Sequence, residues 1–407
     1  MKKLLWIGSF MDKRTNEIMI SQGYKNASSY LSQKNLIEGI EMASGLVFDS
    51  LNAIVMAGYP KQGNIKMRCY EYSHIDGAKD ILVGYVNLLY LNRYFMKKSM
   101  IKAAKKWIKE RYQEQDQVEI FVYEMRSACI DAAVYLKKKI PAAKIHLIIP
   151  DLPCFMDLNM SRFKKRLKQI DWKQMLQKFN YIDDYIPYTE TMVDYLNIRN
   201  KKWMVSEGSL NKKDIEKIIS ESDCVLKCEK SDKNIVMYSG WIDQQYGVDK
   251  LVDAMEYLDD TYELWITGGG SYADNLKEKV LGNRKVKYYG FLPNRTSLLE
   301  LQKQASIMMN IRNPEIEAAH FCFPSKLFEY MLLGIPVISV KLRGIPKEYK
   351  QYLFELSELK PKIIARTIED TMKNEEKKNR AEAGKKFVIK EKNNIAVGKK
   401  ILEFIGN

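Results

Sequence analysis

The chain has 407 residues, more than one hydrophobic core usually organises, so two domains are expected. Its 46% hydrophobic content, rich in Tyr and Met, excludes a disordered chain. The net charge of +15 lies mostly in residues 1–205, with 33 Lys and Arg against 21 Asp and Glu, so nucleic acid or an anionic membrane could meet that half.

The N-terminus reads as a buried strand. Two lysines precede only a short apolar run, residues 4–11, and charged residues follow at once, so no signal peptide is expected. The longest apolar window, residues 81–96, contains polar side chains and is too short to span a bilayer. The six cysteines are scattered, which favours reduced thiols in the cytoplasm.

Strands and helices alternate along the chain, which predicts an α/β fold with mainly parallel sheets. The first half has helical patterns at 29–43, 86–113 and 126–138 and strand-like runs at 4–10, 52–58, 119–124 and 144–150. The second half has strand-like runs at 234–240, 262–269, 285–290, 306–312 and 336–340. We therefore predict an N-terminal domain over 1–206, a polar connection over 207–233, a C-terminal domain over 234–385 and a final helical segment over 386–407.

A basic amphipathic helix is predicted at residues 160–178, where Phe163, Leu167 and Ile170 stand among many cations. Such a helix suits an anionic membrane surface. An ordinary surface helix that packs one face on the sheet is the equal alternative.

The most informative segment is FCFPSKLFEYMLLGIPVISV, residues 321–340. Pro324 suits the first turn of a helix that begins at Ser325, Gly334 suits its left-handed end, and 337–340 is a β-branched strand. Lys326 and Glu329 are i,i+3 neighbours on one face near the helix start, where free amides and the lysine favour an anion. Without the surrounding pattern, a surface ion pair between the two side chains is the favoured interpretation.

This segment resembles the signature of group-1 (GT4) retaining glycosyltransferases, and more narrowly a bacterial polysaccharide branch with the pattern NPR…FPSK…EY…G.P, here Asn310-Ile311-Arg312 and then FPSKLFEYMLLGIPVI. The resemblance implies a GT-B fold: two Rossmann-like domains that face a central cleft, with a C-terminal helix that crosses back to the N-domain. It implies a nucleotide-sugar donor, UDP- or GDP-linked, as substrate and no cofactor. No Asp-x-Asp occurs, so a metal route is disfavoured.

The resemblance also implies roles for residues. Arg312 and Lys326 would stabilise the leaving diphosphate, and Glu329 would bind the donor ribose, next to Ser325 and Leu327 at the helix start. Ser239 and Gly240 would offer backbone contacts to the donor. A loop with Phe291 and Leu292 would lie near the base.

On the acceptor side, Gly8 and Ser9 end the first strand in a cleft loop, and His320 precedes the signature. Asp151, at the end of a predicted strand, would point into the cleft, where it could bind acceptor hydroxyls or assist proton transfer. A purely structural role for Asp151 in its turn is an equal alternative.

Three departures separate the chain from the family pattern. Phe321 stands where an acidic residue is usual, and Trp241 and Tyr246 stand where phosphate-binding cations are usual. A non-catalytic subunit or scaffold with this fold is therefore the alternative to an enzyme. Weaker alternatives are an epimerase on the same fold and a nucleic-acid binder, for which no recognition motif is found.

The sequence thus predicts a cytoplasmic glycosyltransferase of cell-surface polysaccharide biosynthesis that binds no nucleic acid. Its acceptor would be a saccharide or a lipid-linked saccharide. Peripheral contact with the inner face of the plasma membrane would occur through the basic first half.

Overall fold

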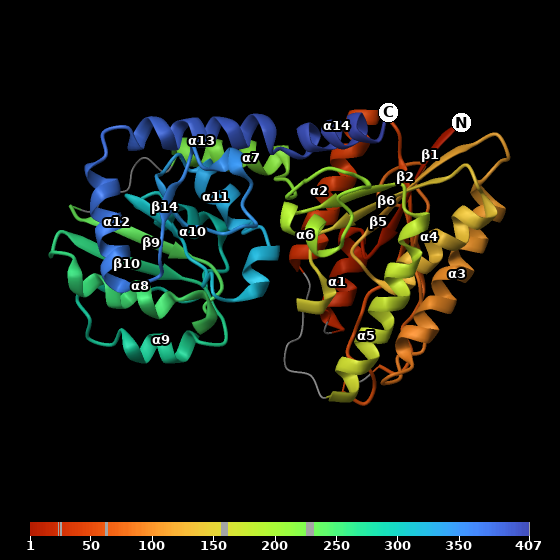
Figure 1. Cartoon of the computed structure of the whole chain (residues 1–407), viewed down its shortest axis with the longest axis horizontal. Helices are drawn as coiled ribbons and strands as arrows, with labels where there is room; N and C mark the ends of the chain where they lie inside the picture. Colours follow the sequence, from red (N-terminus) through yellow and green to blue (C-terminus); the bar gives the residue numbers. More distant parts are fainter. Residues whose placement is uncertain (23, 25–26, 62–63, 156–161, 225–231, 407) are drawn as a thin grey trace. The chain divides into compact units, whose positions relative to one another are not determined.

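The computed structural model describes the whole chain except residues 23, 25–26, 62–63, 156–161, 225–231 and 407 (Figure 1). Contacts divide the chain into two compact units: unit 1 is Met1–Ser209 with Asn394–Asn407, and unit 2 is Leu210–Asn393. No helix among the described residues is both long and apolar enough to span a bilayer.

Unit 1 has an eight-stranded sheet of order β3-β4-β2-β1-β5-β6-β7-β8, parallel except for the β3–β4 pair. Its strands are β1 (Lys2–Gly8), β2 (Phe48–Asn52), β3 (Tyr70–Tyr72), β4 (Asp80–Leu82), β5 (Gln117–Tyr123), β6 (Lys144–Ile149), β7 (Asp184–Pro187) and β8 (Lys202–Trp203). Its helices are α1 (Lys13–Ser21), α2 (Ala27–Ser44), α3 (Asn92–Arg111), α4 (Ser127–Lys139), α5 (Arg162–Leu176), α6 (Glu190–Tyr195) and α14 (Asn394–Ile405), with 3₁₀ turns η1 (Pro153–Phe155) and η2 (Gln177–Tyr181).

Unit 2 has a six-stranded, all-parallel sheet of order β11-β10-β9-β12-β13-β14. Its strands are β9 (Asn234–Ser239), β10 (Tyr262–Thr267), β11 (Val286–Tyr288), β12 (Ile307–Asn310), β13 (Val337–Val340) and β14 (Phe354–Leu356). Its helices are α7 (Lys212–Cys224), α8 (Val248–Ala254), α9 (Ala273–Lys279), α10 (Arg295–Gln302), α11 (Lys326–Leu332), α12 (Pro361–Lys373) and α13 (Lys377–Glu391), with 3₁₀ turns η3 (Gln244–Tyr246), η4 (Met255–Tyr257), η5 (Glu317–Phe321) and η6 (Lys347–Tyr349).

Alternate residues of the unit 2 strands feed two cores, one on each face of the sheet. In β9, Val236 and Tyr238 pack in the core that α8 and α12 cover, and Ile235 and Met237 pack in the core that α11 and α13 cover. Burial on both faces explains why these strands read as continuous apolar runs in the sequence.

The unit boundaries differ by a few residues from the domain limits read in the sequence. Unit 1 ends at Ser209, and the region predicted as a connection contains α7, whose Ile215 and Ile218 pack in a unit 2 core. Residues 225–231, near the end of that region, lie outside the described residues. The final segment is a pair of helices, of which α13 belongs to unit 2 and α14 packs on α2 in unit 1.

One predicted strand is misplaced. The run 52–58 is expected to be a strand, whereas β2 spans Phe48–Asn52. The polar residues of β2 hide it in the sequence: Asp49 is buried against Trp107 and Arg111, and Ser50 donates to Asp80. Because these polar groups are satisfied inside the fold, the strand is buried without being apolar.

Candidate functional site

The carboxyl ends of the parallel strands of unit 2 lie along one edge of its sheet, where ligands bind in open α/β folds. The loops that leave this edge begin at Gly240 after β9, at Gly268 after β10 and at Ile311 after β12. The loop after β11 carries Phe291, whose side chain is 72% exposed, and the β9 loop carries Trp241, which is 58% exposed. Two large aromatic rings are thus open to solvent at this edge.

Glycines let three of these loops pack directly against one another. A Cβ on Gly268 would lie 1.8 Å from the Gly240 carbonyl oxygen, and one on Gly270 would lie 2.0 Å from the Ile242 carbonyl oxygen. The Gly268 N–H donates to the Gly290 carbonyl at 2.9 Å. The glycine run is therefore explained by close contact between loops.

Ser239 and Gly240, at the end of β9, are hydrogen-bonded to other segments of unit 2. The Ser239 N–H donates to the Tyr330 hydroxyl at 3.0 Å, and the Gly240 N–H donates to the Thr267 carbonyl at 3.0 Å. The Ser239 hydroxyl is buried and accepts hydrogen bonds from Thr267 and Gln302. The expectation that both backbones are open to a donor does not fit these contacts, since the protein itself uses both N–H groups.

Tyr330 brings the signature helix to the end of β9. Lys326 stands one turn before Tyr330 on α11, and its Nζ lies 2.7 Å from the Glu329 carboxylate. Both side chains are partly exposed. The ion pair that the i,i+3 spacing allows is therefore present in the structure.

The start of α11 is less open than the sequence suggests. The Leu327 N–H donates to the Pro324 carbonyl at 2.8 Å, and the Phe328 N–H donates to the Ser325 carbonyl at 3.2 Å. Leu327 is fully buried, while Ser325 is exposed. The helix end agrees with prediction, because Gly334 has a φ of 68°.

Arg312 follows β12 and contacts the loop after β9. Its guanidinium is 5.0 Å from the ring centroid of Tyr246, a favourable cation–π arrangement. Burial raises the pKa of the neighbouring Tyr238, Tyr246 raises it further, and the positive charge of Arg312 lowers it. Tyr246 thus holds the Arg312 guanidinium beside the loop after β9.

Unit 1 presents its own carboxyl edge, where Gly8 ends β1 and Ser9 follows it. A Cβ on Gly8 would lie 2.4 Å from Oε1 of Gln33, and the Ser9 N–H donates to that oxygen at 2.9 Å. Gln33 returns a hydrogen bond to the Ser9 hydroxyl at 2.8 Å. The space that the glycine opens is occupied by Gln33 of α2.

Sequence reasoning missed the charged pair Glu124 and Arg126, which follows β5 at the same edge. Glu124 has a φ of 73°, in the left-handed region that non-glycine residues seldom adopt. Its carboxylate accepts a hydrogen bond from Ser29 at 2.6 Å and pairs with Arg126 at 2.5 Å. Only an acid two positions before an arginine at a strand end could have drawn attention to them.

The remaining predicted site residues, Asp151, Leu292 and His320, lie in three different segments of the chain. Asp151 is exposed in the turn after β6, and its charge contributes to raising the pKa of Tyr188, for which burial is the main cause. Leu292 is half-buried beside Phe291, and His320 lies in η5. Among the residues that the structure describes, no cluster of three His, Cys, Asp or Glu side chains could hold a metal ion.

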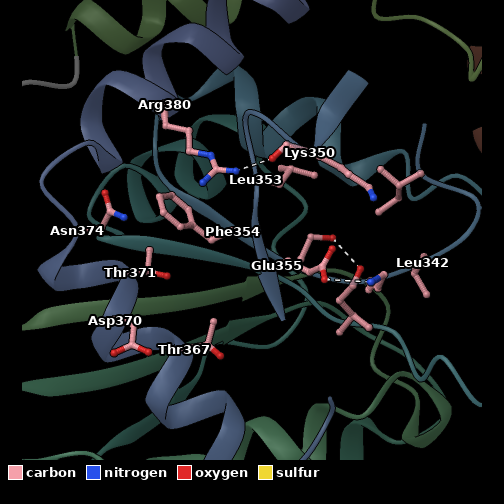
Figure 2. A pocket seen from close by; sticks show the side chains of 14 residues that line it. Leu342, Lys350, Leu353, Phe354, Glu355, Thr367, Asp370, Thr371, Asn374 and Arg380 are labelled. Atoms are coloured by element: carbon pink, nitrogen blue, oxygen red, sulfur yellow. Dashed lines mark hydrogen bonds and ion pairs between the residues drawn. The ribbon is translucent and has the colours of Figure 1, made fainter. Parts of the chain in front are cut away.

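A pocket of about 500 Å³ lies elsewhere, between β13, β14 and α12 in unit 2 (Figure 2). Thr367, Asp370 and Thr371 line it from α12, and Arg380 lies over the Phe354 ring. None of the predicted site residues lines this pocket, so it is separate from the loops described above.

The family relationship follows from residues 227–405, which match the family described as glycosyl transferases group 1. This segment, less than half of the chain, is thus similar to group 1 glycosyltransferases. The matched segment contains the signature helix, Arg312 and most of both unit 2 cores, whereas Ile215 and Ile218 of one core precede it. No match was found among curated protein sequences.

Solved structures show that the whole chain has the GT-B fold. One similar structure is HepE from Anabaena in complex with UDP, at 13% identity and a TM-score of 0.63, with 99% of each chain covered. Another is the lipopolysaccharide outer core galactosyltransferase WaaB, at 16% identity and a TM-score of 0.64, covering 100% of this chain and 99% of WaaB. Sucrose-phosphate synthase from Thermosynechococcus elongatus is similar at 14% identity and a TM-score of 0.64, covering 99% of this chain and 98% of its own.

Proposed function

We propose that this protein transfers a sugar from a nucleotide diphosphate sugar, UDP- or GDP-linked, to a saccharide or lipid-linked saccharide acceptor. The observation that carries the proposal is a pair of cations near the end of β9, within the segment that matches group 1 glycosyltransferases. Arg312 lies over the Tyr246 ring in the loop after β9. Lys326 lies one turn before Tyr330, whose hydroxyl accepts a hydrogen bond from Ser239 at the end of β9. HepE, which has the same fold, was solved with UDP, and this supports UDP as the first nucleotide to test.

In the proposed reaction, Arg312 and Lys326 stabilise negative charge as it develops on the leaving diphosphate. The Lys326–Glu329 pair opens when the donor enters, so that Lys326 meets phosphate and Glu329 accepts hydrogen bonds from the ribose hydroxyls. Trp241 and Phe291 offer exposed rings to the base. The reaction uses the donor as substrate, needs no cofactor and retains the anomeric configuration, as the family resemblance implies.

The acceptor side of the proposal lies in unit 1. Asp151 is exposed at the carboxyl edge, and the Glu124 carboxylate is 18% exposed at the same edge. Carboxylates at such positions bind sugar hydroxyls through charge-assisted hydrogen bonds. We assign the reaction to the cytoplasm and to cell-surface polysaccharide biosynthesis, with the basic unit 1 meeting the inner face of the plasma membrane.

The decisive experiment measures thermal stabilisation of the full chain by UDP, GDP, ADP and their sugars, followed by a transfer assay with the nucleotide sugar that binds. Lys326→Ala with Glu329→Ala, and Arg312→Ala, should each weaken nucleotide binding at least about tenfold, since each removes a charged contact. A matched control is Glu358→Ala with Lys360→Ala, an exposed ion pair of unit 2 at 2.6 Å, which should bind as wild type does.

A non-catalytic subunit with this fold is the second candidate, favoured by Phe321, Trp241 and Tyr246 at positions where the family usually has charged residues. It predicts nucleotide binding without transfer or donor hydrolysis. Absence of any nucleotide binding by the wild-type chain would overturn the proposed transfer reaction.

A further inference from the structure

The pocket between β13, β14 and α12 has no part in the proposed reaction, since none of the proposed donor or acceptor residues lines it. All of its lining residues belong to unit 2, and its volume of about 500 Å³ is in the range of small-molecule sites. Figure 2 shows Thr371 and Asp370 of α12 on one side, Glu355 of β14 on the other, and Arg380 beside the Phe354 ring. Polar groups from separate segments of unit 2 thus converge on one cavity.

The face of α12 that borders the pocket is polar. Thr367, Asp370 and Thr371 of α12 and its C-cap Asn374 follow one another at i, i+3, i+4 and i+7, which is the spacing of one helix face. All except Thr371 are at least partly exposed, as expected of a polar face in contact with water. Thr371 is only 2% exposed, so this face carries a polar group into the interior.

The buried hydroxyl of Thr371 makes no hydrogen bond within the part of the chain that the structure describes. Ile364 and Ile368 precede it on the buried side of α12, so the helix period predicts an apolar residue at this position. The Thr367 hydroxyl, by contrast, donates to the Ile363 carbonyl at 2.8 Å. Because a buried hydroxyl without a partner costs free energy, its presence in the wall of a cavity indicates a ligand that bonds to it.

Two cations line the pocket without a carboxylate partner among the described residues, Arg380 and Lys350. Arg380 donates to the backbone carbonyls of Lys350 and Gln351, and its guanidinium lies 4.6 Å from the centroid of the Phe354 ring. Burial lowers the pKa of Arg380, which means that its charge is partly removed from water. The N–H groups of the guanidinium that are not used by the two carbonyls are suited to a phosphate or a carboxylate of a ligand.

The acidic side chains of the pocket are paired with other cations. Glu355 pairs with Lys341 at 3.3 Å, and Asp370 pairs with Arg366, one turn earlier on α12, at 3.7 Å. These acids therefore leave the charges of Arg380 and Lys350 uncompensated. Asp370 still has acceptor capacity for hydroxyl groups, because a carboxylate offers several lone pairs.

Other classes of small ligand fit this lining less well. A nucleotide base needs an open aromatic face, but Phe354 is 8% exposed and Arg380 lies over its ring. An apolar ligand needs exposed apolar walls, whereas Val340, Leu342 and Leu353 are buried. A metal ion needs clustered acids, and the described residues contain no such cluster.

We propose that this pocket binds a monosaccharide that carries one anionic group, a phosphate or a carboxylate. The anionic group bonds to Arg380 and is attracted by Lys350, and hydroxyl groups of the sugar bond to Asp370, Thr371 and Asn374. The inference goes beyond the proposed function, because it concerns a second ligand at a site that neither the donor nor the acceptor uses.

The test titrates anionic sugars into the full chain by calorimetry, without nucleotide or sugar transfer, so it stays informative if the proposed reaction fails. The panel contains the 6-phosphates of glucose, mannose and N-acetylglucosamine, together with glucuronate and galacturonate, so it separates a phosphate from a carboxylate ligand. At least one of these sugars should bind with a Kd below about 1 mM. Glucose and inorganic phosphate should each bind at least about tenfold more weakly, and UDP should not compete.

Variants of the lining separate the contributions. Arg380→Gln should weaken binding at least about tenfold, since a charged contact is lost. Thr371→Val should weaken it about fivefold and raise the unfolding temperature of the free protein by about 2–4 °C, because it removes the buried hydroxyl. Lys350→Gln should weaken it about threefold, whereas Lys378→Gln, which removes another exposed lysine that does not line the pocket, should bind as wild type does.

No binding by any sugar of the panel, equally tight binding of glucose or inorganic phosphate, or displacement of the bound sugar by UDP would overturn the proposal. Displacement by UDP would locate the sugar at the donor site instead. Thr371→Val keeps the test decisive if Arg380→Gln does not fold, since wild-type affinity in Thr371→Val would also overturn the proposal. Circular dichroism confirms that each variant is folded.

Discussion

Glu124 illustrates how a single residue can carry information that composition and motifs miss. Its left-handed backbone costs about 1–2 kcal/mol relative to glycine, so a residue chosen for stability alone would be glycine or asparagine. It stands in a tight turn between β5 and α4, and its N–H still bonds to the Ile148 carbonyl of β6 at 3.0 Å. The turn therefore presents a carboxylate at the edge of the sheet, which we interpret as acceptor recognition.

Replacement of Glu124 tests that interpretation. Glu124→Gly relieves the left-handed strain while it removes the ion pair, so the free energy of unfolding should stay within about 1 kcal/mol of wild type. Glu124→Gln keeps the size of the side chain and removes its charge. Both variants should raise the acceptor KM at least about tenfold, because a charge-assisted hydrogen bond to a hydroxyl is lost.

The readout that decides is the contrast between the two substrates. Stabilisation by the nucleotide and the KM for the donor should not change in either variant, and Glu114→Gln, on the exposed surface of unit 1, should match wild type throughout. An unchanged acceptor KM combined with lower stability would assign Glu124 a structural role only.

At the scale of elements, long apolar strands and the signature helix were predictable, whereas short strands were not. β9, β10, β12 and β13 stand out because both faces are buried, while β4 and β14 have three residues each and no period to detect. The i,i+3 spacing within the signature was enough to predict that Lys326 and Glu329 share one face of α11, where they form an ion pair. The use of the Ser239 and Gly240 amides depends on Tyr330 and Thr267, contacts between distant segments that no local pattern encodes.

The close contact between α14 and α2 also depends on residues far apart in the sequence, the glycines Gly398 and Gly39. A Cβ on Gly398 would lie 2.4 Å from the backbone of Gly39, and one on Gly39 would lie 2.0 Å from the Asn394 carbonyl oxygen. Gly398→Val should therefore push the C-terminal helix off unit 1 and cost about 1–3 kcal/mol in denaturant unfolding. Lys399→Val, at the exposed neighbouring position, should cost much less; equal effects would mean that helix propensity, and not the close crossing, explains the loss.

At the scale of the whole molecule, the two units differ in how their stability is expected to depend on pH. Unit 1 contains two histidines that each lie between two carboxylates. His146 is fully buried and bonds to Asp184 at 2.7 Å and Glu119 at 2.9 Å, and these contacts raise its pKa although burial alone would lower it. Because the fold raises the pKa of both histidines, the stability of unit 1 depends on their protonation.

His74 sets the pH range of that dependence. Burial alone would lower its pKa, but hydrogen bonds to Asp80 at 2.7 Å and Glu41 at 3.0 Å raise the pKa from 6.5 to about 9. Between these values the folded chain binds more protons than the unfolded chain, so stability falls as pH rises. The stabilisation is complete below pH 6.5 and is lost as the pH passes about 9, a window that lies below the titration of ordinary tyrosines.

The expected result is a loss of about 1–3 kcal/mol from unit 1 between about pH 7 and pH 9.5, with little change in unit 2. Hydrogen exchange under native conditions, corrected for the intrinsic pH dependence of exchange, resolves the two units because the slowest amides of each sheet report its own unfolding. His74→Gln should be less stable than wild type near pH 7 and should show a smaller decline, since glutamine cannot carry the charge that Asp80 and Glu41 hold. A decline of the same size in unit 2, or an unchanged profile in His74→Gln, would show that the charge on His74 does not set the alkaline stability of unit 1.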